Sequence, residues 1–188
     1  FFQLGGDLLR SKSMDRNTYD AGDWFNKVDF TKTDNNWNKG LPLAEDNQEK
    51  WPLMTNIIAN SETQVLQNNI EFASNVFTEF LAIRHSSALF KLTTAQDVYD
   101  RVGFHNTGTS QSQGLIVMSL DDGTGLTDVD TNNDAIVVII NGSSMQQSHT
   151  ITTASGFELH SVQQSSDDST VQMASFTLDG GTGLGDGT

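Results

Sequence analysis

The sequence predicts a mixed α and β chain in which a long aromatic loop and one helix precede an antiparallel β-domain. Residues 1–60 hold all three Trp and both Pro, with little helical or strand periodicity after Leu9. From Ser61 onward, apolar residues recur at steps of three and four, which indicates an amphipathic helix. Beyond residue 97, short β-rich runs separated by Gly, Asn, Asp and Ser indicate strands joined by turns.

Length and composition limit the domain count and the kinds of partner. At 188 residues the chain can hold one full domain and a piece of another, but not a (β/α)8 barrel of about 250 residues. Its 24 acidic and 10 basic residues give a net charge of −14, which disfavours nucleic acid or an anionic membrane and favours a neutral ligand. The alternative is that the excess of acidic residues reflects adaptation to salt and solubility, and not the binding of a ligand. The absence of Cys leaves neither a disulfide framework nor a thiolate zinc site.

The two ends of the sequence suggest a piece of a longer protein. No apolar run approaches the roughly 20 residues of a membrane span. The chain starts inside an apolar stretch without Met, so we expect further sequence before it. The Gly-rich residues 179–188 resemble a turn leading to another strand, so we expect the β-domain to miss its final strand. An open edge invites pairing, so self-association through exposed strand edges is a further expectation.

The helix and the strands follow from local patterns. Ser61–Gln64 fits a capping box, and the apolar periodicity continues to about Arg84, so one helix is predicted over 61–84. The run Ala135–Ile140 is apolar at every position, which predicts a central strand covered on both faces. The expected strands are Val98–Phe104, Leu115–Leu120, Ala135–Ile140, His149–Thr152, Phe157–Val162 and Val171–Leu178.

The loop over residues 8–26 is the most informative stretch for function. It combines cations, carboxylates, amides and aromatic rings in a short segment. Sugars are bound by such mixtures, because their hydroxyls need polar partners and their C–H faces pack on Trp or Tyr. The alternative is an ordinary polar loop in which Trp24 and Phe25 are packing anchors.

Several blocks resemble a known family. The blocks LLRSKS (residues 8–13), DRNTYDAGDWFN (15–26) and Asp34–Pro42 are similar to the pullulanase-type α-1,6-glucosidases of glycoside hydrolase family 13. The blocks Phe104–Gly108, Gly114–Gly123 and Ile136–Asn141 are similar to the family's C-terminal domain in the same order. The resemblance therefore covers nearly the whole chain.

The resemblance implies a fold and a location. Residues 1–88 would be the end of the catalytic (β/α)8 barrel, with Phe1–Gly6 as the last strand, 7–60 as its loop and 61–84 as its helix. Residues 89–188 would be an antiparallel C-terminal β-sandwich. A loop after a barrel strand belongs to the substrate face. The parent protein would be extracellular or at the cell surface.

The resemblance also implies an activity, namely retaining hydrolysis of α-1,6-glucosidic bonds in pullulan or limit dextrins by two Asp and one Glu. In the family these carboxylates precede this segment, so no catalytic residue is expected here and the chain alone should be inactive. The residues expected to contact substrate are Arg10, Asp15, Tyr19, Asp23, Trp24 and Asn26. Their alternative role is loop architecture, and the alternative function is a non-catalytic α-glucan-binding or structural β-sandwich module.

Metal binding has little support in the sequence. Asp128–Asp134, with Asp121 and Asp122 nearby, places oxygen ligands at alternate positions, as calcium prefers. The segment lacks the Gly at position six and the Glu at position twelve of an EF-hand, so an acidic turn is favoured and calcium stays the alternative. The four His show no zinc-binding spacing. No metal ligand is predicted.

Overall fold

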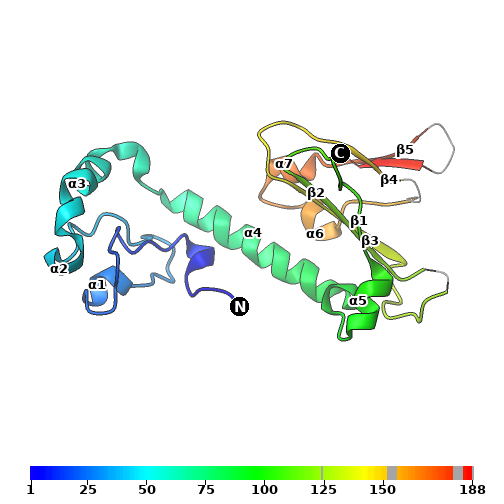
Figure 1. The fold of residues 1–188 in the computed structure, drawn as a ribbon, viewed down its shortest axis with the longest axis horizontal. Coiled ribbons are helices and arrows are strands. Elements are labelled where there is room, and N and C mark those ends of the chain that lie inside the picture. Colours follow the sequence, from blue (N-terminus) through cyan, green and yellow to red (C-terminus); the bar gives the residue numbers. More distant parts are fainter. Residues whose placement is uncertain (124, 152–155, 180–183, 188) are drawn as a thin grey trace. The chain divides into compact units, whose positions relative to one another are not determined.

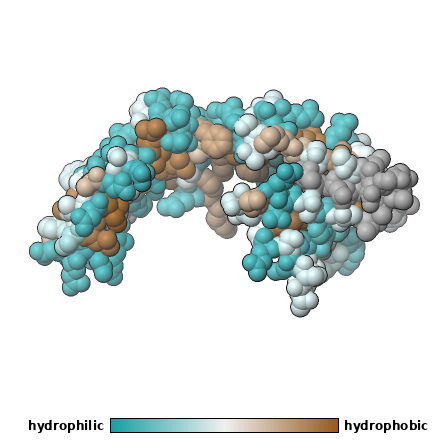
Figure 2. All heavy atoms as spheres, turned by 90° about the horizontal axis from the view of Figure 1, so that it is seen from above, coloured by the Kyte–Doolittle hydropathy of each residue, from teal (hydrophilic) through white to brown (hydrophobic). Residues whose placement is uncertain are grey.

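The computed structural model describes residues 1–123, 125–151, 156–179 and 184–187. These residues form two compact units, Phe1–Thr78 and Glu79–Thr188, and the long helix α4 (Gln67–Ser86) contributes to both (Figure 1). The predicted mixture of helices and antiparallel strands is confirmed. Hydrophobic side chains also reach the visible surface among hydrophilic ones (Figure 2).

None of the helices within the described ranges is long and apolar enough to cross a bilayer.

The first unit consists of short helical segments before α4. They are η1 (Gly6–Leu8), α1 (Asp23–Asn26), α2 (Ala44–Asn47), η2 (Gln48–Lys50), α3 (Trp51–Ala59) and η3 (Ser61–Thr63). The strand expected over Phe1–Gly6 is not formed, because a barrel strand needs hydrogen-bonded neighbours and no described strand pairs with it. Instead Gly5, with φ +83°, turns the chain into η1, and the Phe2 ring stacks on Phe77 of α4 at 4.3 Å between centroids.

Helix α3 corrects the expectation of a structureless stretch up to residue 60. Pro52 lies at the start of this helix, where the missing backbone N–H needs no acceptor within the helix. The Trp51 indole N–H donates to the Pro42 carbonyl at 2.9 Å, and Met54 is buried. The two Pro and the Trp therefore organise a helix and its entry instead of marking a loop.

Helix α4 begins later than the capping-box reading predicted. Asn60 caps the short segment η3 by accepting the Glu62 N–H at 3.0 Å, so Ser61 does not start the long helix. The Leu66 N–H donates to Asn69 Oδ1 at 3.0 Å, which is the reciprocal half of a capping box at the true start. The predicted helix is otherwise present, and its end at Ser86 lies close to the expected Arg84.

In the described part of the second unit, the strands form two three-stranded antiparallel sheets, in the orders β1-β2-β3 and β4-β6-β5. The strands are β1 (Val102–Phe104), β2 (Leu115–Asp121), β3 (Ala135–Asn141), β4 (His149–Ile151), β5 (Phe176–Asp179) and β6 (Leu184–Gly187). One core cluster joins them, with Leu115 and Val117 from β2 and Ile151 from β4 at its centre. Side chains of both sheets therefore share one hydrophobic core.

The position of β3 corrects the prediction of a central strand. β2 pairs with both β1 and β3, whereas β3 lies at the edge of its sheet among the described strands. The side chains of β3 are only partly buried over Ala135–Val138 and exposed from Ile139. An apolar run shows that a segment can be a strand, but the position of that strand in a sheet depends on which other segments pair with it.

Three predicted strands are partly helical because polar side chains cap helices there. Thr94 caps α5 (Ala95–Arg101), which follows η4 (Ala88–Lys91) and replaces the start of the strand expected at Val98. His160 caps α6 (Ser161–Gln164), and Asp168 caps α7 (Ser169–Gln172). Such side-chain hydrogen bonds stabilise helix starts in segments whose composition favours strands.

The C-terminal segment differs from its prediction as well. Leu184–Gly187, expected to belong to a turn, pairs with both β4 and β5 as strand β6. Thr152, the expected end of the strand after His149, lies outside the described residues.

Candidate functional site

Asn26 holds the loop of residues 10–26 together. Its side-chain N–H donates to the Thr18 carbonyl at 2.7 Å, and its Oδ1 accepts from Lys12 Nζ at 3.3 Å. Lys12 Nζ also donates to Thr18 Oγ1 at 2.7 Å, and Arg10 Nη1 donates to the Asn26 carbonyl at 3.3 Å. The structure therefore brings Arg10 and Asn26 together inside the loop, which agrees with their alternative, architectural role.

Asp15 accepts a hydrogen bond from Asn47, a residue that the sequence analysis missed. Asn47 is 2 % exposed, and its Nδ2 donates to Asp15 Oδ1 at 2.8 Å and to the Leu43 carbonyl at 2.9 Å. Its Oδ1 accepts the Arg16 N–H at 3.0 Å. Within the described residues, Asp15 Oδ2 is buried and accepts no hydrogen bond. Nothing local marks Asn47, because its partners lie about thirty residues earlier in the chain.

Tyr19, Asp23 and Trp24 are the predicted site residues that face solvent. Tyr19 is 91 % and Trp24 is 59 % exposed, and Asp23, which is also exposed, begins helix α1 directly before Trp24. Phe25 is 2 % exposed and anchors the segment, so the packing role suggested for both aromatic residues belongs to Phe25. Gly22 has φ +86°, and a Cβ there would lie 3.1 Å from the Trp24 ring. This position therefore needs Gly both for its backbone and for the ring.

Residues 35–39 form hydrogen bonds with residues 11–13 of the preceding loop. The Ser11 N–H donates to the Asn35 carbonyl at 2.7 Å, and Asn36 Nδ2 donates to the Ser11 carbonyl at 3.3 Å. Fully buried Ser13 accepts the Lys39 N–H at 2.9 Å. Two sequence blocks that resemble the known family are thus bonded to each other. Their supporting roles could not be read from spacing, because these contacts join residues about 25 positions apart.

The carboxylates of Asp29 and Asp34, which precede residues 35–39 in the sequence, are held in their ionised form. Hydrogen bonds from the side chains of Thr31 and Thr33 and from backbone N–H groups lower the pKa of Asp29 far below its ordinary value. Burial raises the pKa of Asp34, but bonds from Lys39 and from the Asn36 N–H outweigh it, so the net shift is downward. Neither group is therefore suited to donate a proton near neutral pH.

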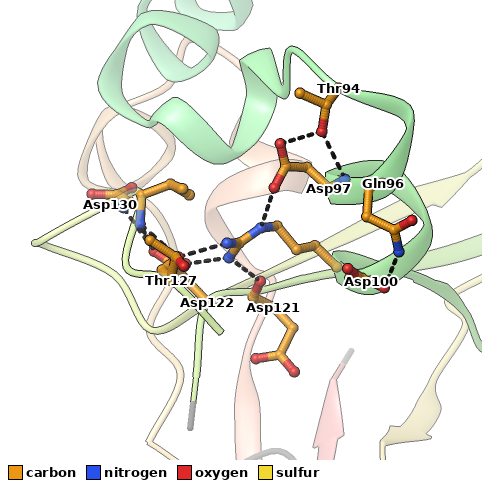
Figure 3. A network of polar contacts seen from close by, with 10 residues as sticks. Thr94, Gln96, Asp97, Asp100, Asp121, Asp122, Thr127 and Asp130 are labelled. Atoms are coloured by element: carbon orange, nitrogen blue, oxygen red, sulfur yellow. Dashed lines mark hydrogen bonds and ion pairs between the residues drawn. The ribbon is translucent and has the colours of Figure 1, made fainter. Parts of the chain in front are cut away.

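In the second unit, Asp121, Asp122 and Thr127 belong to a network of polar contacts (Figure 3). The buried Arg101 side chain donates the hydrogen bonds that join them. Arg101 donates to the Asp122 carboxylate and to the carbonyls of Asp121 and Thr127. The other Asp122 oxygen accepts the N–H groups of Val129 at 2.9 Å and Asp130 at 2.7 Å. Burial raises the pKa of Asp122, but these donors together lower it below its ordinary value.

The carboxylate of Asp130 also accepts several hydrogen bonds. Its carboxylate accepts from the Ser87 hydroxyl, from Asn133 Nδ2 at 2.9 Å and from the Asn132 N–H at 3.1 Å. These bonds, that of Ser87 above all, lower the pKa of Asp130 despite its burial.

The carboxylates of Asp122 and Asp130 do not fit the role of calcium ligands. The carboxylate oxygens of Asp122 and Asp130 already accept N–H and O–H donors, and the Arg101 guanidinium lies where a cation would be repelled. Across the described part of the chain, no group of three His, Asp or Glu side chains is arranged to hold a metal. The favoured interpretation, a structural acidic turn, agrees with this network.

Comparison with known protein families places these features in context. The family described as alpha-1,6-glucosidases, pullulanase-type, C-terminal, matches residues 32–183. Pullulanase 1, chloroplastic, of Arabidopsis thaliana is 39% identical over 180 residues, which cover 93% of this chain and 19% of that protein. Pullulanase of Klebsiella pneumoniae is 38% identical over 170 residues, which cover 87% of this chain and 15% of that protein. The chain thus spans less than a fifth of the length of these relatives.

Solved structures agree over almost the whole chain. The maltotriose complex of PulA from Klebsiella pneumoniae matches with a TM-score of 0.77 and 32% identity, covering 97% of this chain and 19% of that one. PulA from Klebsiella oxytoca matches with a TM-score of 0.77 and 32% identity, covering 97% of this chain and 17% of that one.

Proposed function

The chain belongs to the C-terminal family of the pullulanase-type alpha-1,6-glucosidases, and from this premise we propose that it is part of a starch-debranching hydrolase that cleaves α-1,6-glucosidic bonds in pullulan or limit dextrins. Residues 1–88 would be the substrate-side end of the catalytic barrel, and residues 89–188 the C-terminal β-sandwich. The carboxylates that perform retaining hydrolysis would come from another part of the longer protein.

The exposed group of Tyr19, Asp23 and Trp24 carries this proposal. Two exposed aromatic rings of the loop offer apolar faces to sugar rings, and the exposed carboxylate of Asp23 can accept hydrogen bonds from hydroxyl groups. The hydrogen bonds of Asn26 hold the loop that presents them, so little ordering would be needed when a glucan binds.

The remaining predicted contacts have a positioning role in this proposal. Arg10 and Asn26 bond to each other inside the loop, and Asp15 bonds to Asn47. Their replacement would displace Tyr19 and Trp24 indirectly. In this proposal the exposed Tyr19, Asp23 and Trp24 contact the glucan directly. The hydrogen-bonded residues, which support the loop geometry, are Arg10, Asp15 and Asn26.

Calorimetric titration with maltotriose and with a branched maltodextrin tests the binding role. We expect Trp24→Ala to weaken binding by about tenfold or more, which corresponds to about 1.4 kcal/mol. Phe30→Ala is the matched control, because Phe30 is an exposed aromatic residue (71 %) outside the loop of residues 10–26. Equal losses in both variants, or no binding by the unaltered chain, would refute the role of the exposed group.

A reducing-sugar assay on pullulan separates this proposal from the second candidate, a non-catalytic α-glucan-binding module. The chain alone should release no sugar, whereas the longer protein should do so and should lose activity on Trp24→Ala. A module that only holds glucan would leave the hydrolysis rate unchanged. Exposure of Tyr19 and Trp24 is compatible with both candidates. Trp37 is half-buried, and its indole N–H donates to Thr63 Oγ1 at 3.2 Å. The Trp37 ring therefore does not belong to the proposed binding surface.

The proposed location of the protein is extracellular or at the cell surface. The relatives include a protein named chloroplastic and bacterial pullulanases, so location varies within the family. Immunolocalisation in the source cells tests this proposal, and signal inside an organelle would contradict it.

A further inference from the structure

Strand β3 ends at Asn141, and Gly142 follows it, which makes the one Asn-Gly pair in the sequence. Both residues are exposed in this structure. The side-chain carbonyl carbon of an Asn can react with the backbone nitrogen of the next residue, and Gly hinders this approach least because it has no Cβ. Asn is accordingly counted among the thermolabile residues of proteins. The pair is therefore a candidate for chemical modification without an enzyme.

The carboxamide of Asn141 is ordered by the turn that follows it. Its Oδ1 accepts the Ser143 N–H at 3.0 Å, and its Nδ2 donates to the Met145 carbonyl at 2.8 Å. The Ser143 hydroxyl lies 2.7 Å from Asn141 Oδ1 and 3.0 Å from the Met145 carbonyl oxygen, so it can donate to either. Donors at Oδ1 stabilise the negative charge that develops there when a nucleophile attacks Cγ. The side-chain carbonyl of Asn141 is therefore polarised for attack.

The attacking nitrogen, in contrast, is held by the sheet. The Gly142 N–H donates to the Gly114 carbonyl at 2.7 Å, which continues the antiparallel pairing of β2 and β3 beyond Leu115 and Asn141. Loss of the N–H proton and approach to Cγ both require this hydrogen bond to break. Residues at the end of a strand pair open more readily than those in its middle, so the reaction is slowed but not prevented.

We propose that Asn141–Gly142 is a site of spontaneous deamidation through a succinimide, and that the hydrogen bond from Gly142 to Gly114 limits its rate. The Gly142 nitrogen forms a bond to Asn141 Cγ and gives up its proton. The bond between Cγ and Nδ2 breaks, and the amide leaves as ammonia with that proton. Water, the other reactant, then opens one of the two C–N bonds of the ring, which yields aspartate or isoaspartate with one new negative charge.

The isoaspartate product would change the sheet as well as its charge. It adds a methylene to the backbone at position 141, the residue that pairs with Leu115. Leu115 is 5% exposed and lies in the core cluster shared by the two sheets. Modification at the surface would therefore alter the strand spacing beside the hydrophobic core.

Peptide mapping by mass spectrometry, after incubation of the whole folded chain at mildly alkaline pH, tests the site. We expect the mass increase of deamidation at Asn141 and not at Asn133, which is exposed but is followed by Asp134. Gly142→Ala should abolish this increase because its Cβ hinders the attack. The variant should fold, since Gly142 has no positive φ and its Cβ would lie 3.5 Å from the Gly114 carbonyl oxygen.

Asn141→Gln is a second variant, which keeps an amide at this position but requires a larger ring. It should also show no conversion. Equal conversion at Asn141 and Asn133 in the unaltered chain, or unchanged conversion in either variant, would overturn the proposed site.

Incubation in guanidinium chloride at the same pH tests the limiting role of the hydrogen bond. We expect conversion at Asn141 to be about tenfold or more faster in the unfolded chain, because only the locally open fraction of the folded chain can react. Equal rates in the folded and unfolded chains would show that the bond from Gly142 to Gly114 does not limit the reaction.

Asn106 offers the same test within the folded chain. Its Nδ2 donates to the carbonyl of Leu115 at 2.7 Å, directly after Gly114, so it holds the segment that provides the acceptor. Asn106→Ala should speed conversion at Asn141 about fivefold, the change in open population expected for the loss of a typical hydrogen bond. Asn133→Ala is the matched control, since it removes a side-chain hydrogen bond close to the other end of β3. Equal rates in these two variants would contradict the proposal.

Discussion

Replacement of Asp122 by Ala tests the network that organises the second unit. The side chains of Arg101 and Asp122 are 3% and 1% exposed, so the pair is shielded from water. Asp122→Ala would leave the Arg101 guanidinium buried, and its longer contact to Asp97, at 3.5 Å, would be its one charged partner among the residues that the structure describes. It would also leave the N–H groups of Val129 and Asp130 without their acceptor.

The expected loss of unfolding free energy is about 3–5 kcal/mol, the range for removing one partner of a buried ion pair. A domain has a total stability of only about 5–15 kcal/mol, so this is a large fraction of it. For a unit the size of Glu79–Thr188, the loss corresponds to a decrease in Tm on the order of 10–20 °C.

Thermal and urea unfolding followed by circular dichroism would measure this loss. Asp100→Ala is the matched control, because Asp100 is an exposed carboxylate on the same helix as Arg101 and bonds only to Gln96 among the contacts described. We expect the control to change stability by less than about 0.5 kcal/mol. A loss below about 1 kcal/mol for Asp122→Ala would refute the view that the network holds the unit together.

Two further predictions concern single contacts and pH. Asn47→Ala should destabilise the first unit by about 1–3 kcal/mol, since it leaves the half-buried Asp15 without its donor and the Arg16 N–H without its acceptor. Asn17→Ala, which removes an exposed bond, should have little effect in the same unfolding assay. Because the pKa of Asp122 is lower in the folded state than the unfolded value of about 3.9, its contribution to stability is full at neutral pH and is lost as pH falls through the folded pKa. Asp122→Asn should therefore flatten the decrease in unfolding free energy below about pH 4; an acid limb as steep as that of the unaltered chain would contradict this assignment.

Local patterns predicted the elements whose stability comes from regular burial. The helix ending near Ser86 and the strands at Leu115 and Ala135 were predicted nearly at their observed positions, because their apolar periodicity extends over several turns or alternations. The predictions failed where one capping side chain decided the structure. His160 and Asp168 begin helices in segments that composition assigns to strands, and Asn60 moves the start of α4.

The sequence by itself determined the family, the mixed α and β class and the loop that holds the candidate site, because these depend on residues that are near one another in the chain. Only the tertiary structure decided which loop residues face solvent and which support the loop. Asp15 bonds to Asn47, and Ser13 to Lys39, across 32 and 26 positions. The tertiary structure likewise made β2 central and left β3 at an edge. Strand pairing and buried hydrogen bonds join distant segments, so neither periodicity nor composition of one segment specifies its partner.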